Sequence, residues 1–215
     1  MSERPTRVRV SLTSVADSWR WMRPDLLMRL APFIAAYLAV WLLTSRASWL
    51  GLGVGRPSVQ LTFAAIVTPL SFVAAVTVQL WLSRRRGALN VPAGPRDAAF
   101  QAGFYCLNGP IEEAFFRGLV QGGLTVTLTA PVGFVIATTA YVLYHRLGGW
   151  PWADTFATAL IGVPLGLAFW LLPGPASLLG VSIPHIAATC GFLGPGPYLL
   201  KKLCLLYTSP SPRDS

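Results

Sequence analysis

The sequence predicts an all-α fold, a polytopic transmembrane helix bundle of about six spans. Apolar residues make up 53% of the 215 residues and charged residues only 12%, whereas a soluble domain has about 25% charged residues. The apolar residues form long uncharged stretches, and most Lys and Arg residues stand at the ends of these stretches, as in membrane proteins that follow the positive-inside rule. The net charge of +9 therefore indicates contact with the lipid bilayer, and we expect no nucleic acid partner.

The chain divides into four segments. Residues 1–29 are a basic amphipathic N-terminal segment in which Trp19 and Trp21 suit a position at the lipid headgroups. Residues 30–97 hold two generic transmembrane helices and a linker, and residues 98–203 form the core. Residues 204–215 resemble the translation of a sequencing adapter, so we set them aside and expect the native chain to differ beyond Leu203.

Breaks in the apolar pattern place the spans. The first two are expected at 30–45 and 57–83, and the fourth at 128–145. Pro173-Gly174-Pro175 divides residues 155–200 into a fifth and a sixth span. Asn108-Gly109-Pro110 is expected to end a short apolar stretch and to start the third span at Pro110, because Pro is favoured in the first turn of a helix.

Six spans with a cytoplasmic N-terminus put most of the 17 Lys and Arg residues on the cytoplasmic side. We therefore expect an integral membrane protein of a bacterial plasma membrane in this orientation.

Ionisable residues inside the apolar stretches are functional candidates, because a charge in the bilayer is costly. Glu113 and Arg117 are four residues apart, so they are neighbours on one helix face and can form an ion pair. Glu112 lies about 100° away around the helix. We expect Glu113 and Arg117 to support the site, and Glu112 to act as a general base, a role that burial of the carboxyl favours.

His145 and His185 are the two histidines of the chain. Tyr141 precedes His145 by four residues, and Thr189 follows His185 by four, on the same helix face in each case. We expect the Thr189 hydroxyl either to bond the imidazole and fix its tautomer or to bond the preceding helical turn. A span that begins at Pro110 places Glu112 level with the histidines. In an unbroken helix, Glu112 would lie roughly 20 Å deeper than His145.

Each of these features has a structural alternative. A Glu–Arg pair in a membrane helix can be purely structural, and a histidine at the end of a span is often interfacial. A carboxylate pair and both histidines on three different spans nevertheless favour a shared active site within the bundle.

Three short motifs, around Glu112, His145 and His185, resemble those of the CPBP intramembrane proteases. This group contains the CAAX prenyl endopeptidases and bacteriocin-processing or abortive-infection proteins. The sequence Glu112-Glu113-x-x-x-Arg117 matches the first motif EExxxR. Tyr141 replaces the usual Phe four residues before His145, and Thr189 replaces the usual Asn or Asp four residues after His185. The resemblance covers about residues 98–200, which makes 98–203 a CPBP-like catalytic core.

This resemblance implies an intramembrane endopeptidase that cuts a peptide bond near the cytoplasmic membrane face. Glu112, helped by His145, would activate water. His185 and position 189 would stabilise the oxyanion, and Glu113 and Arg117 would support the site. Because Thr offers one donor where Asn offers two, the oxyanion donor can also come from elsewhere.

The metal requirement stays open at this point. Glu112, His145 and His185 would suffice as zinc ligands, but they also suffice for a glutamic-type mechanism without a cofactor, which we favour. The expected partners are the lipid bilayer and a membrane-associated peptide or protein substrate. The alternative functions are a non-catalytic membrane immunity or scaffold protein of the same fold, or a proton-coupled transporter, since buried Glu and His also build proton relays.

Overall fold

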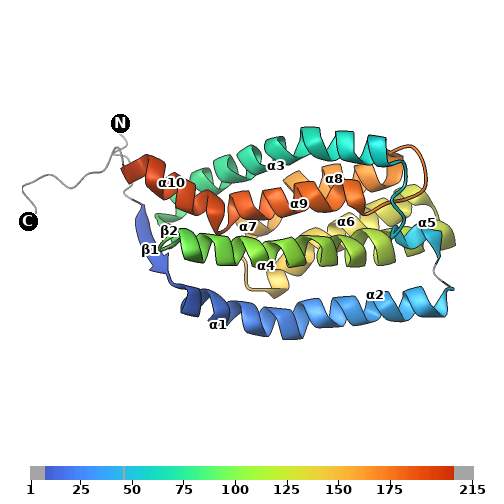
Figure 1. Cartoon of the computed structure of the whole chain (residues 1–215), viewed down its shortest axis with the longest axis horizontal. Coiled ribbons are helices and arrows are strands. Elements are labelled where there is room, and N and C mark those ends of the chain that lie inside the picture. The colour runs from blue at the N-terminus through green and yellow to red at the C-terminus, as the bar shows by residue number, and fades with distance from the viewer. Residues whose placement is uncertain (1–7, 46, 206–215) are drawn as a thin grey trace, which may run out of the picture.

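The computed structural model describes residues 8–45 and 47–205, which form a bundle of long helices with a small sheet at one end (Figure 1). The predicted all-α helix bundle is confirmed, apart from this sheet. Residues 206–215, most of the adapter-like tail, lie outside the described residues. The elements in chain order are β1 (Arg9–Thr13), α1 (Val15–Asp25), the π-helix η1 (Leu26–Leu30), α2 (Ala31–Leu43), the 3-10 helix η2 (Ser48–Leu50), α3 (Pro57–Arg86), β2 (Ala88–Pro92), α4 (Pro95–Glu113), the π-helix η3 (Ala114–Gly122), α5 (Gly123–Thr127), α6 (Ala130–Leu147), α7 (Trp152–Ala157), α8 (Ala159–Leu171), α9 (Leu179–Phe192) and α10 (Pro195–Leu205).

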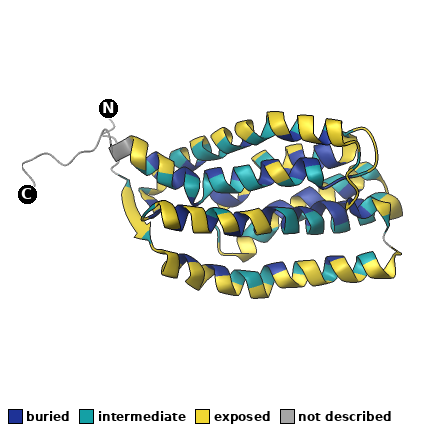
Figure 2. Ribbon diagram, in the orientation of Figure 1, coloured by how far each residue is buried: buried dark blue, intermediate teal, exposed yellow. Residues whose placement is uncertain are grey.

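Three helices of the described chain are long and apolar enough to cross a membrane: Val15–Leu43, Pro57–Arg86 and Trp152–Leu171. Helix Leu179–Phe192 is apolar but shorter. Exposed residues lie along the outer faces of these helices (Figure 2). They include large apolar residues such as Leu43, Leu70 and Leu171. Because a membrane supplies apolar surroundings for such side chains, this surface is that of an integral membrane protein.

The N-terminal helix is continuous across the predicted boundary between residues 29 and 30. Residues Val15–Leu43 form one helix, which contains the π-helical turn η1 at Leu26–Leu30. Ser14 caps its first turn by accepting a hydrogen bond from the Asp17 backbone nitrogen. The basic segment and the first span are therefore one structural unit from Val15 onward.

The predicted break at Gly109-Pro110 is wrong. Both residues lie inside α4, which continues through η3 and α5 to Thr127. Pro110 lacks the N–H that would bond to the preceding turn, but the other hydrogen bonds of the helix persist around it. Gly109 allows α4 to pack closely against α9. A Cβ at this position would lie 3.0 Å from Ile186 Cγ1 and 3.2 Å from the Ile186 backbone nitrogen of α9.

The expectation that an unbroken helix would separate Glu112 from the other groups is wrong as well. The relevant reference point is the turn at Leu128 and Thr129 between α5 and α6, not the start of the helix. Glu112 precedes Leu128 by 16 residues and Tyr144 follows Thr129 by 15, so both lie roughly 23 Å from this turn at 1.5 Å per residue. The two arms of the hairpin therefore bring Glu112 level with the end of α6.

A two-stranded parallel sheet was not predicted. Strand β1 pairs with β2 from Arg9↔Ala88 to Thr13↔Pro92, which joins the N-terminal segment to the end of α3 (Figure 1). Helix α3 ends just before this sheet at Gly87, whose φ of +69° favours glycine.

Asp97 anchors the start of the N-terminal helix to α4. This buried carboxylate accepts hydrogen bonds from the hydroxyls of Thr13 (2.8 Å) and Ser18 (2.7 Å) and from Gln101 Nε2 (3.1 Å). Because buried polar groups are costly when unpaired, this network fixes the position of α1 on α4.

Candidate active site

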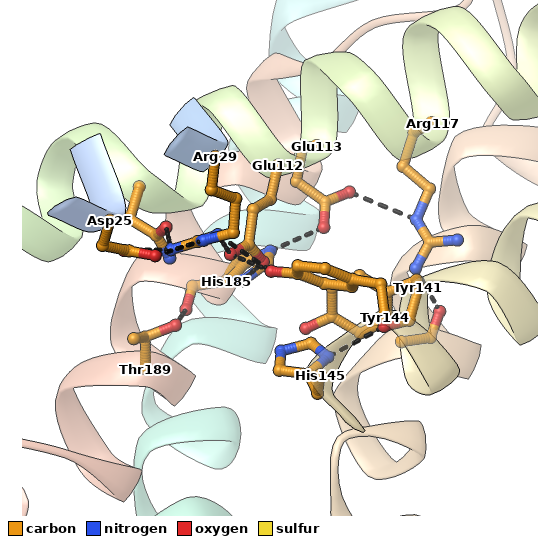
Figure 3. A network of polar contacts seen from close by, with 12 residues as sticks. Asp25, Arg29, Glu112, Glu113, Arg117, Tyr141, Tyr144, His145, His185 and Thr189 are labelled. Carbon is orange, nitrogen blue, oxygen red and sulfur yellow. Dashed lines mark hydrogen bonds and ion pairs between the residues drawn. The ribbon is translucent and has the colours of Figure 1, made fainter. Parts of the chain in front are cut away.

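A cavity of about 1230 Å³ lies inside the bundle. Its apolar walls include residues of α3, α6 and α8, while its polar groups come from α1, η1, α4, α6 and α9. Figure 3 shows these polar side chains converging from different helices. The residues of this group that line the cavity are Asp25, Arg29, Asn108, Glu112, Tyr141, Tyr144, His145, His185 and Thr189.

Glu112 is at the centre of this group. Its carboxylate is buried, and Oε1 accepts hydrogen bonds from Arg29 Nη1 and from the Tyr144 hydroxyl. Oε2 has no hydrogen-bond partner among the described residues and lies 3.4 Å from His185 Nε2. One carboxylate oxygen is therefore anchored, and the other is buried next to the His185 ring.

Glu113 connects the predicted ion pair to His185. Its Oε2 lies 3.3 Å from Arg117 Nε, and both side chains are fully buried. Its Oε1 lies 2.6 Å from His185 Nδ1, a contact that the sequence did not predict. A carboxylate on Nδ1 favours the tautomer that carries hydrogen there and directs Nε2 toward Glu112. Glu113 therefore orients the imidazole, and Arg117 holds Glu113.

His145 lies at the cavity, near the end of α6. Its Nδ1 is 2.8 Å from the Tyr141 carbonyl oxygen, so Nδ1 carries the hydrogen in the neutral ring and Nε2 is an acceptor. The ring packs against Tyr141, Tyr144 and Trp150, with ring centroids 4.3–5.0 Å away. No hydrogen bond joins His145 to Glu112 in the described part of the chain; Tyr144 lies next to both.

Thr189 does not fix the tautomer of His185. Its hydroxyl donates to the His185 backbone oxygen at 3.0 Å, the intrahelical bond that threonines in membrane helices commonly form. Of the two expected bonds, the one to the preceding turn is present, and Glu113 rather than Thr189 contacts the imidazole. Thr189 nevertheless lines the cavity.

Sequence reasoning missed four residues of the site: Asp25, Arg29, Asn108 and Tyr144. Arg29 binds Asp25 through Nε and Nη2 (2.6 and 2.5 Å) and donates to the Tyr144 hydroxyl (2.9 Å). The available signal was the Asp25–Arg29 spacing of four residues at the edge of an apolar stretch. That spacing predicts an ion pair, but it does not indicate which helix the pair faces.

The three candidate zinc ligands, Glu112, His145 and His185, all line the cavity. The separation of Glu112 Oε2 and His185 Nε2 could suit two ligands of one ion. However, Arg29 already places a positive charge on the same carboxylate, which opposes a second cation by charge repulsion. Within residues 8–45 and 47–205, no three His, Cys, Asp or Glu side chains are positioned to hold a metal ion.

Comparison with known families matches residues 95–190 to the family described as Type II CAAX prenyl endopeptidase Rce1-like. The predicted family resemblance is confirmed. The CAAX-protease-like segment contains all three motifs and runs from α4 into α9. Neither a curated protein nor a solved structure matches the chain. The N-terminal helix and α3 lie outside the CAAX-protease-like segment, although both line the cavity.

Proposed function

We propose that the chain is an intramembrane endopeptidase in which Glu112 and His145 activate the attacking water. The observation that supports this proposal is the convergence of Glu112, His145 and His185 at one cavity inside a membrane bundle, with Glu113 behind His185. In such surroundings a carboxylate with one unpaired oxygen is suited to general base catalysis.

In the first step, the water oxygen attacks the carbonyl carbon of the scissile bond and its proton passes to Glu112 Oε2. The acceptor nitrogen Nε2 of His145 holds the same water from the α6 side. Tyr144 contributes to this alignment, because it bonds Glu112 and packs against His145.

In the second step, the negative charge that develops on the carbonyl oxygen needs a hydrogen-bond donor. His185 supplies it from Nε2 when both ring nitrogens are protonated, since the Glu113 carboxylate next to Nδ1 stabilises the positive charge of the ring. The C–N bond then breaks, and the proton held by Glu112 passes to the leaving amine nitrogen. Asn108, whose Oδ1 accepts from Arg29 at 2.6 Å, keeps its amide hydrogens as further donors at the cavity.

The length of the helices supports cleavage near one membrane face. Helices α4, η3 and α5 together extend from Pro95 to Thr127, about 50 Å at 1.5 Å per residue, whereas the hydrocarbon core is about 30 Å thick. With Thr127 at one boundary of this core, Glu112 lies within about 8 Å of the other. We place that boundary at the cytoplasmic face of a bacterial plasma membrane, because it lies toward the arginines at the end of α3 and the N-terminal segment.

Hydrolysis of a membrane-anchored peptide tests this function. The substrate class follows from the family description and from the largely apolar cavity. The probe is a quenched fluorescent peptide that ends in Cys-aliphatic-aliphatic-X and carries a farnesyl group on its Cys. We expect the full chain in liposomes to cut it at one bond and, in ¹⁸O-enriched water, to place ¹⁸O in the new carboxyl group. An intact probe would overturn the proposal.

We further propose that this reaction needs no metal cofactor. The Arg29 cation on Glu112 supports this view. We expect turnover in the same liposome assay to persist after treatment with a membrane-permeable chelator, and elemental analysis to find zinc well below one equivalent per chain. Loss of turnover on chelation that zinc alone restores would contradict the proposal.

A further inference from the structure

We propose that Arg29, from the N-terminal helix outside the CAAX-protease-like segment, is a positioning residue that orients Glu112 for hydrolysis. This inference rests on the proposed function. It implies that the active site is incomplete without the helix Val15–Leu43, whereas the motifs alone place every working residue between 112 and 189.

Arg29 is held in place by partners on three helices. Asp25, one turn earlier, binds it at two nitrogens (2.6 and 2.5 Å), and Asn108 of α4 accepts from Nη2 at 2.6 Å. The remaining nitrogen, Nη1, donates to both Glu112 and Tyr144. Since a guanidinium is planar and its donors are fixed, these contacts determine the direction from which it meets Glu112 (Figure 3).

This arrangement fixes the rotation of the Glu112 carboxylate. Arg29 and Tyr144 both bond Oε1, which leaves Oε2 beside His185 with no hydrogen-bond partner in the described chain. Without Arg29, the Tyr144 hydroxyl alone would hold Oε1, and the carboxylate could turn either oxygen toward the water. Loss of such alignment reduces turnover without changing the catalytic groups.

Asp25 offsets the positive charge that Arg29 places next to the proposed base, Glu112. A guanidinium paired only with Glu112 would cancel the charge that attracts the proton of water. Because Asp25 binds the same guanidinium bidentately, the group Asp25–Arg29–Glu112 keeps a net charge of about −1 at neutral pH. Glu112 is therefore both oriented and negatively charged.

The register of the N-terminal helix on the core is fixed by contacts on both sides of Arg29. Before it, Ser18 bonds Asp97 of α4 (2.7 Å). After it, the Phe33 ring stacks on Phe115 with centroids 3.9 Å apart. The N-terminal helix and α4 run in the same direction (Figure 1), and these contacts occur in the same order along both, so Arg29 meets Glu112 in this register.

The backbone conformation near Arg29 and Glu112 is a second, independent indication that their contact is functional. Arg29 lies in the π-helical turn Leu26–Leu30, and Glu112 and Glu113 directly precede the π-helix Ala114–Gly122. π-Helical turns are rare and frequently occur at functional sites. One of the two lies on each side of the contact between Arg29 and Glu112.

The test compares Arg29→Ala with Arg20→Ala in the liposome assay. Arg20 lies on the same helix and pairs with Asp17, but its side chain is exposed, so its loss should leave turnover unchanged. We expect Arg29→Ala to lower kcat by about 10- to 100-fold with little change in KM. Millimolar methylguanidinium, which replaces the missing side chain, should restore part of the kcat of this variant only.

A second variant, Asp25→Asn, keeps both Arg29 and Glu112 and removes the charge that offsets the guanidinium. We expect its kcat to fall as well, without rescue by methylguanidinium. If Arg29→Ala does not fold, the kcat of Asp25→Asn alone tests the positioning role of Arg29. Wild-type kcat in both Arg29→Ala and Asp25→Asn would overturn the positioning role, as would a loss in Arg29→Ala that methylguanidinium does not relieve. If these variants cut the probe normally while Glu112→Gln does not, the protease proposal stands and only this inference fails.

Discussion

Replacing Glu112 with Gln should lower turnover of the membrane-anchored peptide by about 10²- to 10⁴-fold, the contribution typical of a general base. The amide oxygen of Gln can still accept from Arg29 and Tyr144, so the fold and the cavity should persist. The amide NH₂, however, would take the place of Oε2 and cannot accept the proton of water. The measurement is the initial rate of cleavage in liposomes at matched protein content.

The control for this variant is Asp17→Asn, which makes the same chemical change at an exposed carboxylate in the first turn of α1. It should cleave at the wild-type rate. A Glu112→Gln protein that unfolds at the wild-type temperature and still cuts the probe normally would refute the role of Glu112 as the base. It would also favour a non-catalytic scaffold or immunity function.

Local sequence patterns were sufficient to predict most helices and the Glu113–Arg117 pair. The apolar stretch at 57–83 became α3, and Pro173-Gly174-Pro175 falls in the connection between α8 and α9. A spacing of four residues determines which side chains share a helix face, and the structure contains the expected ion pair. These features depend on neighbours within a few turns, which a single sequence reveals directly.

The error at Gly109-Pro110 has a tertiary cause. Glycine and proline commonly end helices, and the sequence does not show that α9 passes close to Gly109, with Ile186 where a side chain would otherwise stand. Packing against α9 stabilises the helix across Pro110 and outweighs the local preference of these two residues. The expected depth of Glu112 in an unbroken helix was also wrong, because it was measured from the start of the helix and not from the turn at Leu128 and Thr129.

Residues that are distant in the chain were the least predictable part of the site. Arg29 and Glu112 are 83 residues apart, and β1 pairs with β2 across a similar separation. The sequence places Arg29 at the edge of an apolar stretch, where an arginine usually extends to the lipid headgroups. The contacts of Ser18 and Phe33 with α4 and η3 direct it to the cavity, and such contacts are visible only in three dimensions.

Of the substitutions discussed, Arg117→Met should lower the free energy of unfolding most. The guanidinium is fully buried, lies 3.3 Å from Glu113, donates to Thr138 (3.1 Å) and bonds the Gly162 carbonyl oxygen (2.8 Å). Its removal leaves the buried Glu113 carboxylate without its guanidinium partner, and breaking a buried ion pair in this way costs about 3–5 kcal/mol. We expect the midpoint of thermal unfolding, followed by helical circular dichroism in detergent, to fall by roughly 10 °C for a chain of this size.

Two comparisons distinguish the stability lost with the ion pair from the stability lost with side-chain volume. Arg84→Met, at an exposed position in the last turn of α3, should shift the midpoint by no more than about 2 °C, as exposed substitutions usually do. The double variant Glu113→Gln with Arg117→Met should recover part of the lost stability, because it removes the uncompensated charge that the single variant leaves buried. The double variant should nevertheless stay inactive, since a neutral amide in place of the Glu113 carboxylate would no longer favour a charged His185. If the single and double variants unfold at the same temperature, the buried carboxylate is not the source of the loss, and the Glu113–Arg117 pair does not stabilise the fold through its charges.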